Sequence, residues 1–172
     1  GDASQALAIS AISIGSNSGS SGVNSVVMGD GANSVGFNSV NIGATSVTGN
    51  EGVAIGFNAS ASTNFGTAVG NRATSNFGNG VAIGNLGSSR QQYAIAIGDN
   101  AQSLGVNSIS IGATSNGAGT DSIAIGESSF ADAGGVAIGS GANAPAQQIA
   151  FGSAASNTGA VTVTGDVPCN AL

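Results

Sequence analysis

The sequence predicts an all-β protein: a parallel β-roll, or β-solenoid, of about eleven coils, each of roughly 13–14 residues. Three observations support this fold class. A four-residue string recurs at a nearly constant interval, a small residue recurs three positions after it, and no segment keeps the 3.6-residue apolar stripe of a helix. A coil of this length accommodates two short strands and two tight turns, so equivalent strands of successive coils would pair in parallel about 4.8 Å apart.

The recurring string reads apolar, small, apolar, glycine. Its glycines recur at a nearly constant step along the chain, a regularity that chance does not produce. These motif glycines are Gly15, Gly29, Gly43, Gly56, Gly70, Gly84, Gly98, Gly112, Gly126, Gly139 and Gly152. Stacked in register, the coils would form a rod on the order of 50 Å long.

The bulky residues of the string predict where the core lies. With the two-residue period of a strand, Val and Ile of one motif share a face, and we expect that face to pack inward against small residues of the facing strand. The predicted core residues are Ile14, Val40, Ile42, Val53, Ile55, Val81, Ile83, Ile95, Ile97, Ile109, Ile111, Ile123, Ile125, Val136 and Ile138.

The residue between the two bulky ones would then face outward. This column is dominated by Ala, whereas a strand face in solvent would carry Thr, Lys or Glu. We therefore expect another copy of the chain to cover it, which makes it a candidate trimer interface. Its members are Ala54, Ala82, Ala96, Ser110, Ala124, Ala137 and Ala150.

Composition supports folding and narrows the function. Charged residues make up only 6% of the chain but hydrophobic ones 41%, whereas disorder needs low hydrophobicity together with high net charge. Eight acids against Arg72 and Arg90 give a net charge of −6, which excludes nucleic acid as a partner because phosphate binding needs clustered cations. No apolar run approaches the length of a membrane span, so we expect no membrane insertion by this segment.

Catalysis and metal binding are also disfavoured. The sequence has no His and a single Cys, Cys169, so neither a nucleophile–histidine pair nor a zinc site can be assembled. Asp30, Asp99 and Glu127 each follow a motif glycine singly, as solvated acids on turns do. We expect no enzyme activity, metal or cofactor. Cys169 is either a chance terminal residue or the site of an intermolecular disulfide.

The motif resembles that of a known family. Residues 107–112 read Asn-Ser-Ile-Ser-Ile-Gly and residues 121–126 read Asp-Ser-Ile-Ala-Ile-Gly. Both are similar to the Asn-Ser-Val-Ala-Ile-Gly repeat of trimeric autotransporter adhesin heads of the YadA type. The resemblance implies a left-handed roll, a homotrimer with its copies side by side, and display on a Gram-negative outer membrane as part of a longer chain. Residues 1–152 would be head repeats, and 153–172 a terminal coil and the start of a neck-like or linker segment.

The resemblance also implies an adhesin that attaches to extracellular matrix, host cells, abiotic surfaces or sister cells. A structural spacer in a surface or phage-type fibre is the alternative, and an ice-binding solenoid a distant third. Exposed aromatic residues would be a candidate ligand ledge, namely Phe37, Phe57, Phe65 and Phe77, followed closely by Tyr93. The other interpretation is that these rings cover corners of the roll or wedge between protomers.

Overall fold

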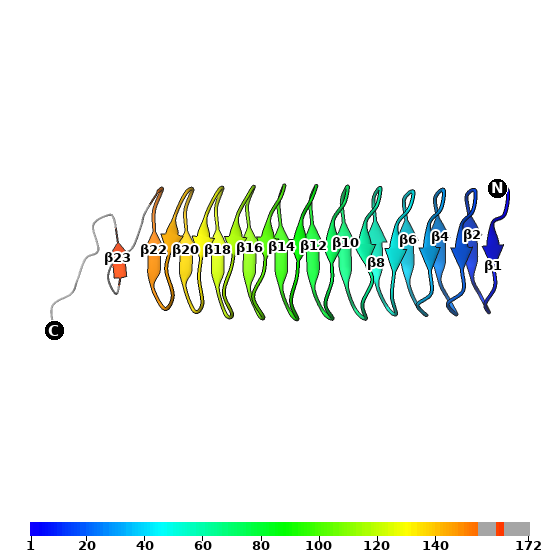
Figure 1. Cartoon of the computed structure of the whole chain (residues 1–172), viewed down its shortest axis with the longest axis horizontal. Coiled ribbons are helices and arrows are strands. Elements are labelled where there is room, and N and C mark those ends of the chain that lie inside the picture. The colour runs from blue at the N-terminus through cyan, green and yellow to red at the C-terminus, as the bar shows by residue number, and fades with distance from the viewer. Residues whose placement is uncertain (155–160, 164–172) are drawn as a thin grey trace.

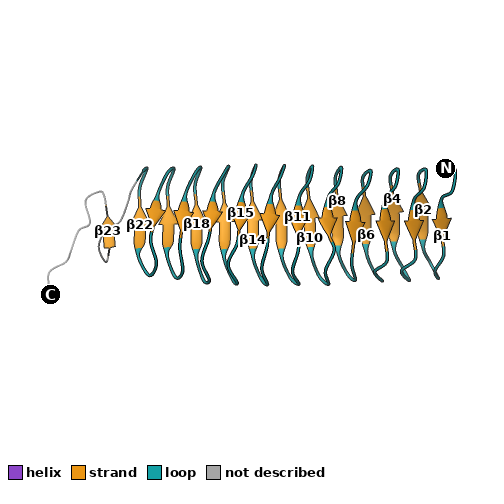
Figure 2. Ribbon diagram, viewed as in Figure 1, coloured by secondary structure: helices purple, strands orange, loops and turns teal. Residues whose placement is uncertain are grey.

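The computed structural model describes residues 1–154 and the backbone of strand 161–163, and this part of the chain is an elongated roll of two parallel β-sheets (Figure 1). Strands and turns alternate along it without a helix (Figure 2), and so no helix of the described residues could cross a bilayer. The predicted β-solenoid is confirmed. The predicted neck-like segment and Cys169 fall largely or wholly on residues 155–160 and 164–172, which lie outside the described residues.

One sheet has 11 strands of two residues, each paired with the equivalent strand of the next coil. They are β1 Gln5–Ala6, β3 Gly19–Ser20, β5 Asn33–Ser34, β7 Val47–Thr48, β9 Ser60–Ala61, β11 Thr74–Ser75, β13 Ser88–Ser89, β15 Gln102–Ser103, β17 Asn116–Gly117, β19 Phe130–Ala131 and β21 Asn143–Ala144.

The other sheet has 12 strands of three residues, formed by the motif strings. They are β2 Ile12–Ile14, β4 Val26–Met28, β6 Val40–Ile42, β8 Val53–Ile55, β10 Thr67–Val69, β12 Val81–Ile83, β14 Ile95–Ile97, β16 Ile109–Ile111, β18 Ile123–Ile125, β20 Val136–Ile138, β22 Ile149–Phe151 and β23 Val161–Val163. The register never slips: motif residues align with motif residues, as Ile95 does with Ile109 and Ala96 with Ser110.

Two four-residue turns join the strands of each coil. In the coil that begins at Gly98, the amide of Ala101 donates to the carbonyl of Gly98, and that of Ser108 donates to Gly105. The third residue of each turn, Asn100 or Asn107, has a positive φ of 51° or 57°. Asn and Gly are the residues that adopt this conformation at least cost, which explains the Asn that opens the motif.

The motif glycine is required for a different reason. Gly112 has a φ of 133°, and a Cβ there would stand 2.5 Å from the carbonyl oxygen of Gly126 in the next coil. Stacked motif glycines therefore pass each other too closely for any side chain.

A second set of glycines lies seven residues after the motif glycine, at Gly22, Gly36, Gly105 and Gly119. Gly105 is one of them, and its φ is not positive. Its constraint is space, because a Cβ would overlap the carbonyl group of Gly119 in the next coil.

The interior of the roll is the reverse of the predicted one. The Ala column between the bulky residues is fully buried within a single chain: Ala54, Ala82, Ala96, Ser110, Ala124, Ala137 and Ala150 are all 0% exposed. The predicted core residues instead point outward, where Ile14 is 53% and Ile111 37% exposed. The sequence-based assignments of the bulky residues to the core and of the Ala column to the trimer interface were both wrong. One error entails the other, because the two sets of residues lie on opposite faces of the same strands.

The cause of the inversion is the narrowness of the roll. Each coil contributes four inward positions, and Ala, Ser or Gly fills nearly all of them, so the two sheets approach too closely for Val or Ile. The sequence carried a signal for this. The residue two before each buried Ala shares its face, and that column is also small, as at Gly80, Ala94 and Ser108.

Candidate functional site

The outward side of the 12-stranded sheet, here called the apolar face, is a continuous hydrophobic surface along the roll. It is formed by the first and third residues of the strands β2 to β22, which are apolar at every position except Thr67. These side chains are half-buried or exposed, at 36% for Ile55, 38% for Ile83 and 39% for Phe151. A contiguous apolar surface of this extent marks a site of association.

The outward side of the 11-stranded sheet, here called the polar face, differs in chemistry. Its two-residue strands present mainly hydroxyl and amide side chains, as at Ser60, Thr74, Ser88, Gln102 and Asn116, and the apolar exceptions are Val47 and Phe130. The roll is thus two-sided: one face is suited to water, and the other resembles a protein interface.

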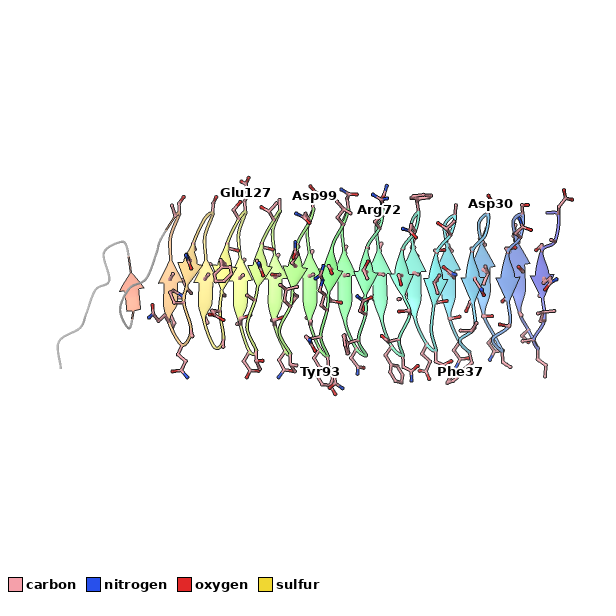
Figure 3. All side chains as sticks on the ribbon, in the orientation of Figure 1. Asp30, Phe37, Arg72, Tyr93, Asp99 and Glu127 are labelled. Atoms are coloured by element: carbon pink, nitrogen blue, oxygen red, sulfur yellow. The ribbon has the colours of Figure 1, made fainter. Side chains whose placement is uncertain are left out.

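The turns form two edges that run along the roll (Figure 3). The first edge consists of the turns that follow the motif glycines, and Asp30, Arg72, Asp99 and Glu127 project from it. The second edge consists of the turns that precede the motif strings, and Phe37 and Tyr93 project from it on the opposite side. All six side chains are exposed.

The predicted aromatic ledge is therefore split between the two edges. Phe37, Phe65 and Phe77 belong to turns of the second edge, whereas Phe57 directly follows Gly56 and lies on the first. Their exposed fractions are similar, from 44% at Phe37 to 54% at Phe57. The second edge also carries Tyr93, 51% exposed, which continues the row one coil beyond Phe77.

Polar side chains of neighbouring coils pair along the edges. The amide of Asn85 donates to Asp99 at 2.7 Å, and that of Asn107 donates to Asp121 at 2.9 Å, each across one coil step. The acids act here as partners of stacked amides. Among the described residues no cluster of His, Cys, Asp or Glu could hold a metal ion, and no pocket is present. A partner would therefore bind to the outer surface of this part of the molecule.

The repeats of the roll match a known protein family. The family model described as the YadA head domain repeat matches residues 48–73, 66–86, 91–115 and 118–142, which together are more than half of the chain. The chain belongs to the YadA head family. The resemblance noted in the motif is thereby confirmed, and with it the general role of a YadA-type adhesin head, exposed at a cell surface.

A solved structure is also similar to this YadA-type head. The crystal structure of the collagen-binding domain of the Yersinia adhesin YadA matches with 25% sequence identity and a TM-score of 0.35, over 94% of this chain and 69% of that one. A comparison with curated proteins finds no match.

Proposed function

We propose that this YadA-type head is a non-enzymatic adhesin that acts as a homotrimer and attaches its bearer to extracellular matrix, host cells or other surfaces through many weak contacts. The observation that carries the proposal is the match of the YadA head repeat along the roll, together with the apolar face that the roll leaves uncovered. Its place would be the outer surface of a Gram-negative bacterium, as part of a longer chain.

The apolar face supports the homotrimer and relocates its interface. The Ala column cannot contact another protomer, because it is enclosed within its own chain. Full burial of one Val or Ile side chain stabilises by about 1.5–3 kcal/mol. Covering even part of this face over many coils would therefore exceed the roughly 4–15 kcal/mol that association costs in lost translational and rotational freedom.

Multivalency supports adhesion without an enclosed binding site. The same coil surface is repeated along the roll and would be presented three times per particle, so weak contacts add up to firm retention. Residues that usually dominate interface energies are scarce: the sequence has no Trp, one Tyr and two Arg. Attachment should then depend on the assembled trimer more than on any one side chain.

The test is to separate assembly from folding. Ile83→Lys with Ile111→Lys places two charges on the apolar face, and the matched control, Gln102→Lys with Asn116→Lys, places them on the polar face. We expect the wild type and the control to sediment at three times the chain mass of 16.0 kDa. The apolar-face variant should sediment at the mass of a single chain, with an unchanged β-sheet circular dichroism spectrum.

Retention is then measured on surfaces coated with collagen, fibronectin or laminin, and on cultured cells. The monomeric variant should lose nearly all retention. A wild type that sediments as a monomer at micromolar concentration would contradict the trimer. A folded monomer that binds as tightly as the trimer would contradict avidity. An intact trimer that is retained on no surface would favour the spacer.

A further inference from the structure

The second edge carries a row of aromatic side chains at one place along the roll. Phe65, Phe77 and Tyr93 belong to the turns of three consecutive coils, and their exposed fractions are 51%, 48% and 51%. Phe37 lies on the same edge two coils before Phe65, so the row spans four coil steps, about 20 Å. Phe65 and Tyr93 share the third position of their turns, two coil steps apart, and Phe77 is at the first position of the turn between them. The exposed rings therefore follow the edge and form a surface that is open to an extended ligand.

Two of these rings occupy backbone positions that disfavour them. Phe65 has a φ of 61° and Tyr93 a φ of 60°, at the turn position where other coils place Asn24, Asn38 or Asn107. Bulky residues adopt the left-handed conformation only at a cost, whereas Asn adopts it readily. The backbone would therefore be more stable with Asn at both positions, and the rings need another reason to be there.

The groups beside the rings are mainly amides. Asn64, Asn76, Asn79 and Gln92 are exposed next to the three rings in the chain, and each offers both a donor and an acceptor. The nearest carboxylate is that of Glu51, which occupies the turn position of Phe65 one coil earlier, and no other carboxylate side chain occurs from residue 52 to residue 98. The cation nearest the row in the chain is Arg90, whose Nε donates to the hydroxyl of Ser88 at 3.2 Å.

Aromatic faces flanked by neutral amides have a defined ligand chemistry. The CH face of a pyranose ring packs against an aromatic ring, and the hydroxyls at its rim exchange hydrogen bonds with amides. The coil spacing of about 4.8 Å is close to the advance of one sugar unit along an extended β-linked chain. Rings on consecutive coils would thus meet consecutive or nearby sugar units.

We propose that the second edge between Phe65 and Tyr93 binds an extended polysaccharide that lies along the roll, with its pyranose rings stacked on Phe65, Phe77 and Tyr93. The inference rests on the proposed adhesin function and specifies a ligand class for it. Phe57, which is exposed to the same degree on the opposite edge, takes no part.

The test compares Phe65→Asn with Tyr93→Asn, in one variant, against the control Phe57→Asn. Probes are cellulose-type and chitin-type chains, which are neutral, and hyaluronan and heparin, which are anionic. Retardation in gels that contain each polymer measures affinity. Wild type and control should be retarded, and the double variant should bind about tenfold or more weakly. Comparing the neutral with the anionic polymers shows which kind of polysaccharide binds the wild type.

Stability provides a readout that a merely structural role would not give. Because Asn suits the left-handed positions, the double variant should melt at the same temperature as the wild type or higher, and should still sediment as the wild type does. Loss of polysaccharide binding with retained or improved stability would confirm the proposal.

Three outcomes would overturn it. The double variant could bind polysaccharide as the wild type does, or it could lose its assembly, which would place the rings between protomers. The third is a wild type that no polysaccharide retards although it adheres to protein-coated surfaces. That result would leave the adhesin function standing, whereas a wild type that adheres to nothing would refute the adhesin function itself.

Discussion

The hydroxyls of Ser103 and Ser108 meet across the interior of the roll, 2.5 Å apart. Ser108 also donates to the carbonyl oxygen of Gly105 at 2.6 Å, so the pair closes the second-edge turn from inside. The same relationship recurs between Ser20 and Ser25 and between Ser34 and Ser39, at 2.5 Å in both pairs. Buried hydroxyl pairs thus take the place of bulky packing where the roll is too thin for large side chains.

The coil that contains Gly117 lacks this pair, and Gly117→Ser should restore it. Ser122 occupies the place of Ser108, but its buried hydroxyl has no hydrogen-bond partner, because Gly117 stands where Ser103 would be. A new hydrogen bond and the loss of a glycine from the unfolded chain should together stabilise by about 1 kcal/mol. Comparing the thermal unfolding of Gly117→Ser with that of Gly117→Ala measures how much of the stabilisation comes from the hydrogen bond of the hydroxyl. Equal melting temperatures for the two would mean that the bond does not form.

Gly112→Ala should be strongly destabilising. The new Cβ would meet the backbone of Gly126 at 2.5 Å while Ala is held at a φ of 133°, and neither strain can relax without moving the next coil. We expect a loss of about 3 kcal/mol or more. Gly117→Ala is the control, because its φ is not positive and the nearest contact is the rotatable hydroxyl of Ser122 at 3.1 Å. Similar urea midpoints for the two variants would show that the motif glycine is not constrained.

Ala96→Leu should unfold the roll locally, because the side chain of Ala96 is enclosed between the two sheets. Ala96 is 0% exposed and aligned with the equally buried Ala82 and Ser110. Overpacking a tight interior costs about 1–3 kcal/mol, and here every neighbouring coil would have to separate. Gln102→Leu on the polar face adds a Leu without entering the interior, and its melting temperature should remain close to that of the wild type. A tolerated Ala96→Leu would place the Ala column outside after all.

Attachment should depend only weakly on ionic strength. Charged side chains make up only 6% of the chain, and the one carboxylate beside the aromatic row of the second edge is that of Glu51, one coil before Phe65. Salt screens exposed charges over about 10 Å at 0.1 M but leaves aromatic and apolar contacts intact. Retention on coated surfaces at low and at high sodium chloride concentration tests this. A steep loss of retention with salt would indicate that the acids of the first edge, such as Asp99, are the contact.

Candidate sites were only partly predictable. The sequence identified Phe37, Phe65 and Phe77 as turn residues, but Phe57 was grouped with them although it directly follows the motif glycine Gly56, whereas the other three precede motif strings. Assigning an edge requires the alternation of the two turns within each coil. The left-handed backbone at Phe65 and Tyr93, which separates these rings from ordinary turn residues, is a property of the folded coil.

The sequence by itself determined the repeat, the parallel stacking, the fold class and the family, because a short, regular period that ends in glycine allows few architectures. Only the tertiary structure decided which side of the motif strand is the inside. Alternation assigns Ile95 and Ile97 to one face of the strand and Ala96 to the other, but it does not say which face is the interior. The distance between the two sheets decides this, because a gap wide enough only for Ala and Ser drives the larger side chains outward.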